Sequence, residues 1–295
     1  MQLRSKAYTQ MHIATFLWGL TAILGKLISI GEFSLVWYRV LFVSIAMLFI
    51  PKIIKHVRQL DKKTVLQISG IGILLSIHWV AWYASIKYAN ASVAVSCIAC
   101  VSLFTAILEP IFTKTPFKTS NLLLSIFVIP GILLINQSLD FHYRFGFFLG
   151  IVAAFIAAIF GILNKKYTQD VQANVITFIQ MLSGFIFLTL LMPLYLYFSK
   201  NEFPIPHQTD VFLLLVLALF CTVIPYNLFL KTLKITDAFT TSLINNLEPV
   251  YGIILAIIFL GENKELNWQF YCGTLIILFA VFLHAFLTQI KNRKM

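Results

Sequence analysis

An apolar stretch near the end of the chain, 238–260, carries a carboxylate at its centre. Glu248 lies 14 residues after Lys234 (248 − 234) and 14 before Glu262 (262 − 248), so each flanking charge is about 21 Å away along a helix. This spacing places Glu248 near the middle of a hydrocarbon layer roughly 30 Å thick. An ionisable group at that depth is costly and is typical of a functional site. Glu248 is therefore the first candidate for coupling, and a neutral or paired structural acid is the alternative.

Polar side chains share a helical face with this carboxylate. Thr241, Asn245 and Glu248 follow one another at intervals of four and three residues, which places them on one side of a helix. Tyr251 flanks the same face, and Pro249 frees a backbone carbonyl one turn earlier. The Asn245 amide offers both a donor and an acceptor. This face is suited to bind an ammonium group or to accept a transported proton.

Arg39 is a second charge inside an apolar stretch, 33–54. A guanidinium stays charged in a protein, so it needs an acceptor, a path outward to water, or a substrate carboxylate. An ion pair with Glu248 would satisfy both buried charges. In the alternative, Arg39 binds the carboxylate of a substrate. The sequence does not decide between the two.

Aromatic and hydrogen-bonding side chains complete the candidate site. Trp79 lies eight residues before Lys87 (87 − 79), deeper than an interfacial aromatic belt, so cavity lining stands beside ordinary core packing as its role. Glu109 is the second candidate for coupling and ranks below Glu248, because it lies only five residues before Lys114, near the cytoplasmic face, where an acid can pair with a basic loop at little cost. The predicted substrate-binding residues are Trp18, Arg39, His78, Trp79, Trp82, Gln180, Tyr226, Asn245 and Tyr251.

Membrane helices must position these residues. The chain of 295 residues is 60% apolar and 11% charged, against about 45–50% and 25% in soluble proteins. Apolar runs between charged or Pro/Gly breaks predict an all-α integral membrane protein with ten transmembrane helices. Their approximate bounds are 11–30, 33–54, 65–87, 91–112, 119–138, 145–164, 172–199, 210–230, 238–260 and 267–289.

Basic residues gather in alternate connections. If the N-terminus is cytoplasmic, most of the 22 lysines and arginines fall on the cytoplasmic side, as the positive-inside rule expects. We therefore predict a multi-pass protein of the cell (inner or plasma) membrane with both termini cytoplasmic. The net charge of +11 is then a topology signal, so a nucleic-acid partner is not expected. The expected partners are the lipid bilayer and a small-molecule substrate. The sequence leaves open whether protons are the coupling ion, and it does not determine the oligomeric state.

The two halves of the chain contain an internal repeat. The segment 87–92 aligns with 234–239 at an offset of 147 residues (234 − 87), half of the chain length. Each half, 1–141 and 142–295, holds five predicted helices, and an odd number inverts the second half relative to the first. Inverted repeats are typical of secondary transporters, which bind substrate near the midplane between the repeats.

Two smaller features concern packing and metal binding. Gly146, Gly150 and Gly161, together with alanines 154 and 157, form a face of small residues that predicts close helix packing. Cys97 and Cys100 have no second cysteine pair or histidine near them, so we interpret them as core residues. We expect no metal site and no cofactor.

Taken together, these residues resemble the EamA-type members of the drug/metabolite transporter superfamily. The matching positions are Trp18-Gly19, Tyr38-Arg39, Ala238 to Glu248-Pro249 and Leu260-Gly261-Glu262. The resemblance implies export or exchange of small metabolites such as amino acids through a central cavity. At the offset of 147, Glu248-Pro249 aligns with Val101-Ser102 and Glu262 with Thr115, so equal chemical roles for the two repeats are not expected.

We therefore predict a secondary transporter that exports amino acids or similar small amphipathic metabolites by alternating access. A nucleotide-sugar or drug transporter of the same architecture is the alternative within this class. A membrane enzyme acting on lipid-linked substrates is disfavoured, because its usual interfacial cluster of acids or histidines is missing from the sequence. No phosphate-binding loop of an ATP-driven pump occurs either.

Overall fold

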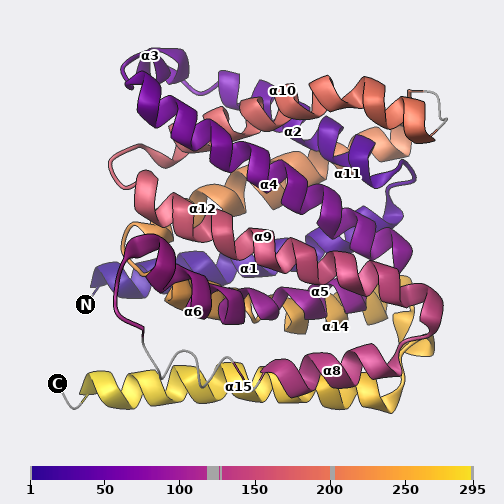
Figure 1. The fold of residues 1–295 in the computed structure, drawn as a ribbon. Helices are drawn as coiled ribbons and strands as arrows, with labels where there is room; N and C mark the ends of the chain where they lie inside the picture. Colours follow the sequence, from indigo (N-terminus) through magenta and orange to yellow (C-terminus); the bar gives the residue numbers. More distant parts are fainter. Residues whose placement is uncertain (1, 118–125, 127, 200–202, 294–295) are drawn as a thin grey trace.

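The computed structural model describes residues 2–117, 126, 128–199 and 203–293, which form helices and short connections (Figure 1). The helices are α1 (Gln2–Leu27), α2 (Glu32–Leu48), α3 (Ile53–Arg58), α4 (Lys62–Tyr88), α5 (Ala91–Ile98), α6 (Cys100–Thr113), α8 (Val128–Ser138), α9 (Arg144–Tyr167), α10 (Ala173–Ser199), α11 (Gln208–Ala218), α12 (Ile224–Leu233), α13 (Ala238–Asn245), α14 (Glu248–Leu260) and α15 (Trp268–Arg293). A π-helical turn, η2 (Leu219–Val223), joins α11 to α12, and η1 (Phe141–Tyr143) and η3 (Glu262–Lys264) are short 3-10 turns.

The predicted all-helical membrane class is confirmed. Six stretches of the described residues are long and apolar enough to cross a membrane: 62–88, 91–113, 141–167, 173–199, 208–233 and 238–260. The predicted helix 33–54 is shorter, because α2 ends three residues before Pro51, which disfavours helix in the residues before it. Of the predicted helix 119–138, the part before Val128 lies outside the described residues, Ile126 excepted.

Two predicted helices are discontinuous. The helix expected over 91–112 divides at Ala99 into α5 and α6. The helix expected over 238–260 divides between Asn245 and Glu248 into α13 and α14, beside Pro249, which has no N–H to continue the hydrogen-bond ladder. These two helices occupy equivalent places in the two halves. Such breaks are typical of transporter helices that border a midplane site.

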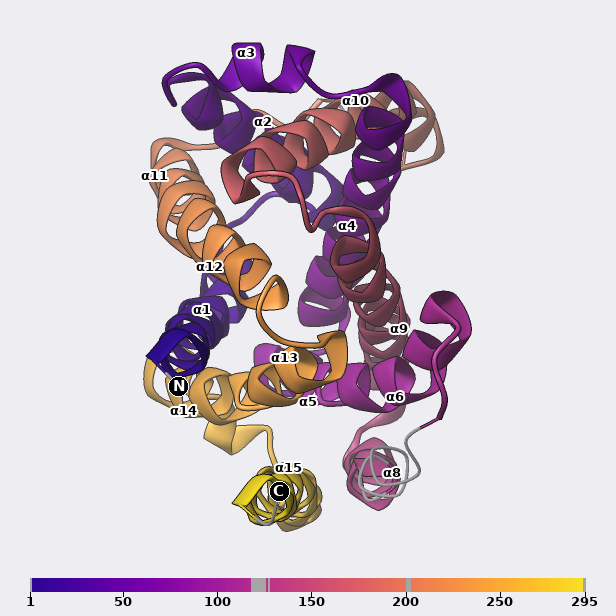
Figure 2. The same ribbon diagram turned by 90° about the vertical axis from the view of Figure 1, so that its left-hand side faces the viewer.

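The halves are arranged around a common interior. Seen along the helix axes in Figure 2, the helices α1, α2, α4, α9 and α12 to α14 surround the interior, while α15 packs against α8 at one edge. In Figure 1, α1 begins at the left-hand end of the bundle and α9 at the right-hand end. The first helices of the two halves therefore run in opposite directions, as an inverted pair should.

Hydrogen bonds at equivalent positions support the repeat. Lys87 and Lys234, aligned at the offset of 147, each donate to a backbone carbonyl just beyond the end of the first helix of their own half, α1 and α9. Asn90 and Asp237, aligned in the same way, cap α5 and α13 by accepting from a backbone N–H three residues later, at 2.8 and 2.6 Å. The two halves thus begin their broken helices with the same local chemistry.

The small-residue face of α9 has two different surroundings. A Cβ added at Gly146 would lie 2.5 Å from the backbone nitrogen of Ala89, and one at Gly150 would lie 2.8 Å from the Ser85 hydroxyl. A Cβ added at Gly161 would meet nothing within 4 Å. The predicted close packing is therefore present at the first two glycines, whereas Gly161 borders open space.

This difference predicts the stability of two matched variants. Gly146→Ala should destabilise the protein by about 1–3 kcal/mol, since the α9 backbone and the C-terminal end of α4 would have to separate. Gly161→Ala should leave stability nearly unchanged, and it controls for the loss of a glycine in the same helix. Thermal unfolding of both purified variants in detergent checks this, and equal melting temperatures would contradict it.

Candidate functional site

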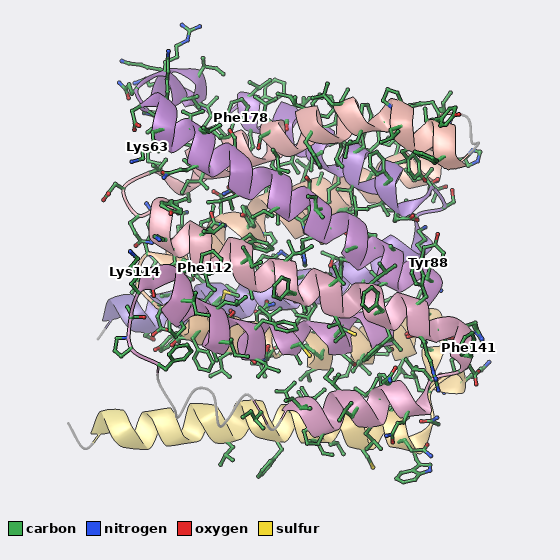
Figure 3. All side chains as sticks on the ribbon, in the orientation of Figure 1. Lys63, Tyr88, Phe112, Lys114, Phe141 and Phe178 are labelled. Carbon is green, nitrogen blue, oxygen red and sulfur yellow. The ribbon has the colours of Figure 1, made fainter. Side chains whose placement is uncertain are left out.

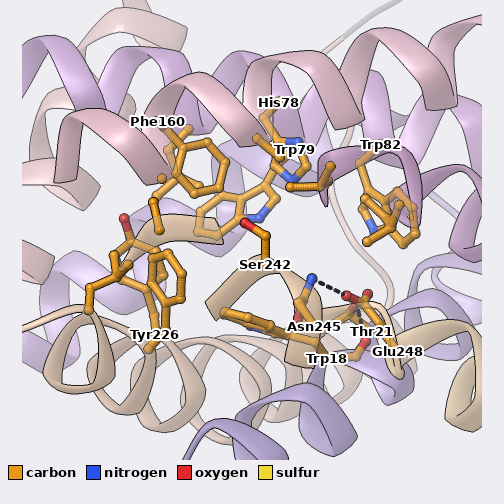
Figure 4. A pocket seen from close by; sticks show the side chains of 18 of the residues that line it. Trp18, Thr21, His78, Trp79, Trp82, Phe160, Tyr226, Ser242, Asn245 and Glu248 are labelled. Atoms are coloured by element: carbon orange, nitrogen blue, oxygen red, sulfur yellow. Dashed lines mark hydrogen bonds between the residues drawn. The ribbon is translucent and has the colours of Figure 1, made fainter. Parts of the chain in front are cut away.

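A cavity of about 80 Å³ lies between the two halves. Helices α1, α2, α4, α5, α6, α9, α12, α13 and α14 all contribute to its wall, so both repeats build it. The wall includes eight of the residues predicted for binding and coupling: Trp18, Arg39, His78, Trp79, Trp82, Tyr226, Asn245 and Glu248 (Figure 4).

Glu248 is the first residue of α14, directly after the break. Its side chain faces the cavity but the residue is only 5% exposed. The Asn245 amide nitrogen donates to its Oε2 at 3.1 Å, as drawn in Figure 4, and the other described residues form no hydrogen bond to this carboxylate. The buried Oδ1 of Asn245 has no hydrogen-bond partner. The break in the helix thus places the Glu248 carboxylate and the Asn245 amide group at the cavity wall.

Arg39 is held by neutral groups. It is 1% exposed, and its Nε donates to the Thr222 hydroxyl at 2.8 Å. Its Nη1 donates to the Tyr83 hydroxyl at 2.9 Å, and its Nη2 to the Cys221 carbonyl at 3.4 Å. Cys221 and Thr222 lie in the π-helical turn η2, a rare element that is frequent at functional sites.

The guanidinium also stacks on an aromatic ring. Its carbon lies 3.8 Å from the centre of the Trp79 ring, a cation–π contact. Three of the five N–H groups of Arg39 are used by the bonds above, so two remain. Among the described residues there is no hydrogen bond between Arg39 and Glu248. Arg39 and Glu248 thus form no internal ion pair among the described residues, and a ligand role for Arg39 stays a prediction.

Aromatic side chains form the apolar part of the wall. Trp79 and Trp82 line it from α4, and Trp18 lines it from α1, where its ring meets that of Phe229 edge-on at 5.6 Å. His78 also lines it, and its Nδ1 lies 2.8 Å from the Ala153 carbonyl. This contact holds the ring in place through Nδ1 and leaves Nε2 as the ring nitrogen of His78 that it does not use.

Gln180 lies outside the cavity wall. It is fully buried and closes a triangle with Asn164 and Tyr226: Tyr226 donates to Gln180 at 2.5 Å, Gln180 to Asn164 at 2.8 Å, and Asn164 to Tyr226 at 3.2 Å. Its amide is therefore already engaged, and its position does not support the predicted substrate contact. Tyr226 does line the cavity, with its hydroxyl held by this triangle.

Tyr251 and Glu109 also lie away from the cavity wall. Tyr251 packs edge-on against Phe16 of α1 at 5.5 Å. Glu109 accepts hydrogen bonds from the backbone N–H groups of Ala238 and Phe239 at 3.2 and 3.3 Å, at the start of α13. Its carboxylate therefore contacts a helix end of the other half, and its predicted coupling role lacks support from its position.

Some residues of the site were not predicted. Tyr83 lies four residues after Trp79 on the same helix face, among the aromatic residues of this helix that the sequence singles out, but it is outside the predicted binding set. Thr222 and Cys221 had no such signal, since the π-helical turn that presents them is not encoded by an obvious motif. The described residues contain no group of three or more His, Cys, Asp or Glu side chains that could hold a metal ion.

Two segments, residues 5–137 and 144–286, each match the model of the EamA-like transporter family, one in each half of the chain. The chain belongs to the EamA-like transporter family. The resemblance inferred from the sequence is thereby confirmed, and the chain is a multi-pass membrane transporter of a small-molecule substrate, not an enzyme. As an EamA-like protein, it consists of two repeats in a lipid bilayer.

The fold of this EamA-like transporter is shared with a solved structure. A protein crystal structure with 12% sequence identity superimposes with a TM-score of 0.70, covering 96% of this chain and 98% of the other. At this identity the likeness establishes the fold alone. No curated protein matches the chain by sequence.

Proposed function

We propose that this transporter exports amino acids or similar small amphipathic metabolites by alternating access. The observation that carries the proposal is a guanidinium and a carboxylate in one cavity, each without a charged hydrogen-bond partner among the described residues. Such a cavity complements a zwitterion. The halves 1–141 and 142–295 rock around it as units, exposing it first to one side of the membrane and then to the other.

Each part of the substrate has a matching group. The two unused N–H groups of Arg39 bind the substrate carboxylate, for which a guanidinium has suitable geometry. The ammonium group lies between the Glu248 carboxylate and the free Oδ1 of Asn245. The apolar side chain packs against Trp79 and Trp82. The aromatic wall favours substrates with large apolar or aromatic side chains.

Glu248 couples transport to protons in this scheme. When ionised it binds the substrate ammonium, and when protonated it does not. A proton taken up after release of the substrate neutralises the buried carboxylate for the return step. Proton entry and metabolite exit are thereby linked.

A nucleotide-sugar substrate has less support. A nucleoside diphosphate carries at least two negative charges, whereas the cavity wall pairs one guanidinium, Arg39, with a carboxylate, Glu248. A second buried negative charge would face Glu248 without compensation. The balance of charges therefore favours a zwitterion.

The orientation in the cell membrane follows from the basic residues. Lys63 and Lys114 lie at the left-hand end of Figure 3, while Tyr88 and Phe141 lie at the opposite end. Helix α1 begins and α15 ends at the same left-hand end. Under the positive-inside rule this end is cytoplasmic, which supports cytoplasmic termini.

Metabolite profiling tests the proposed function. Cells that overexpress the protein should accumulate one or more amino acids in the medium, several-fold above cells without it. Cells expressing Glu248→Gln at the same level are the matched control, and their medium should resemble that of cells without the protein. Accumulation of nucleotide sugars in place of amino acids would refute the substrate class.

A further inference from the structure

The cavity extends toward one end of the bundle. Along the broken helix its wall runs from Ala238, the first residue of α13, to Glu248, which is ten residues or about 15 Å further on. It also includes Leu233, the last residue of α12. The remainder of α14, up to Leu260, is not part of the wall. The cavity therefore lies toward the end that faces the viewer in Figure 2.

Asp210 ties the two halves together at the opposite end. It lies in the first turn of α11, is 3% exposed, and accepts two hydrogen bonds from Ser29, just beyond the end of α1. The Ser29 backbone N–H donates at 2.8 Å and its hydroxyl at 2.5 Å. A carboxylate of the second half thus holds the end of a first-half helix.

Glu262 forms a second tie at the same end. It follows Gly261, whose left-handed backbone (φ 68°) ends α14 and turns the chain. Its carboxylate accepts from the backbone N–H groups of Ala91 and Ser92 at 2.9 and 2.8 Å, and from the Ser92 hydroxyl at 2.6 Å. A carboxylate at the start of α5 is also favoured by the helix dipole.

At the cavity end, a carboxylate also binds the start of a helix of the other half, but with the two halves exchanged and with longer hydrogen bonds. There the carboxylate comes from the first half, Glu109, and the helix start from the second half, α13, with distances of 3.2 and 3.3 Å. Alternating access requires one end to close as the other opens. The shorter carboxylate bonds are found at the end away from the cavity.

We propose that Asp210 and Glu262 are gate residues that close the far end in this state and release their partners, Ser29 and the start of α5, when the cavity opens there. This inference rests on alternating access, which is part of the proposed function. A gate breaks these bonds in each transport cycle, whereas a permanent tie would keep them.

Labelling of a cavity cysteine tests the gate without a substrate. Ser242→Cys places a thiol in the cavity wall, in a Cys272→Ser background that removes the partly exposed natural cysteine. In vesicles of known orientation, a membrane-impermeant maleimide should label it from the cavity end only. Asp210→Asn with Glu262→Gln should raise labelling from the far end several-fold. Glu32→Gln, which removes another carboxylate from the far end, should not, and unchanged far-end labelling in the gate variant would overturn the proposal.

A reversible cross-link separates a gate from a permanent tie. In Ser29→Cys with Asp210→Cys, a short thiol cross-linker should stop flux of radiolabelled L-phenylalanine in liposomes, and reduction should restore it. Full flux in the cross-linked protein would show that the contact stays closed during transport and would overturn the proposal. Absence of flux in the unmodified wild type, with the labelling result intact, would refute the proposed substrate while supporting the gate.

Discussion

Glu248→Gln is expected to lower amino-acid flux about 10- to 100-fold and to remove its dependence on pH. A hydrogen bond to a charged group contributes roughly 1.5–3 kcal/mol, which corresponds to that change in affinity for the substrate ammonium. The wild-type flux should fall as the pH drops, because a proton on Glu248 replaces the ammonium. A glutamine amide takes up no proton, so the variant should show a flat profile. Flux from reconstituted protein, measured over a series of pH values, checks both effects.

The control for this variant is Glu265→Gln. Glu265 is exposed at the far end and accepts one hydrogen bond from Asn90. Its substitution removes the same charge from the chain without touching the cavity, so flux and its pH profile should stay as in the wild type. Coupling by Glu248 would be refuted if Glu248→Gln kept the wild-type pH profile.

Arg39→Lys is expected to raise the KM for amino acids roughly 10- to 100-fold, although the positive charge is kept. A lysine lacks the planar fork that bonds Thr222 and Tyr83 while leaving N–H groups for a ligand, and it loses the stack on Trp79. The loss should affect L-phenylalanine but not L-phenylalaninamide, which has no carboxylate. Competition of the two compounds for labelled substrate measures this. Equal losses for both would argue against a contact between Arg39 and the carboxylate.

Stability provides an independent check on Arg39. If Arg39 were the counter-ion of Glu248, Arg39→Gln would leave a buried charge alone, at a cost of about 3–5 kcal/mol, and Glu248→Gln would restore stability. The hydrogen bonds of Arg39 go to neutral groups, so we expect no such rescue. Melting temperatures of the two single variants and the double variant decide between these cases.

Local spacing was sufficient to predict that the Asn245 and Glu248 side chains lie close together. Glu248 comes three positions after Asn245, and the two side chains do form a hydrogen bond beside the cavity. Apolar run length predicted the helical membrane class. The alignment of Lys87 with Lys234 predicted an internal repeat, and both lysines donate to a backbone carbonyl of their own half. The membrane class was predictable because charge is costly in lipid, and the proximity of Asn245 and Glu248 because they are close neighbours in the chain on either side of the helix break.

Features that depend on tertiary packing were not predicted. The sequence could not show that Gln180 faces Asn164 and Tyr226 rather than the cavity, because both faces of α10 are rich in apolar residues. The alignment at a fixed offset also concealed the roles of Glu109 and Glu262. Their carboxylates perform similar capping at opposite ends, although 109 and 262 are not 147 residues apart (262 − 109 = 153).

Flux of radiolabelled L-phenylalanine across liposomes tests most directly whether the cavity is the transport path. The purified wild type should give saturable flux that unlabelled amino acids inhibit. Ser242→Trp, which fills the cavity wall beside Asn245, should give none while retaining the melting temperature of the wild type. Saturable wild-type flux together with its loss in this variant is the predicted result. Equal flux through both proteins, or no saturable amino-acid flux through the wild type, would contradict the account.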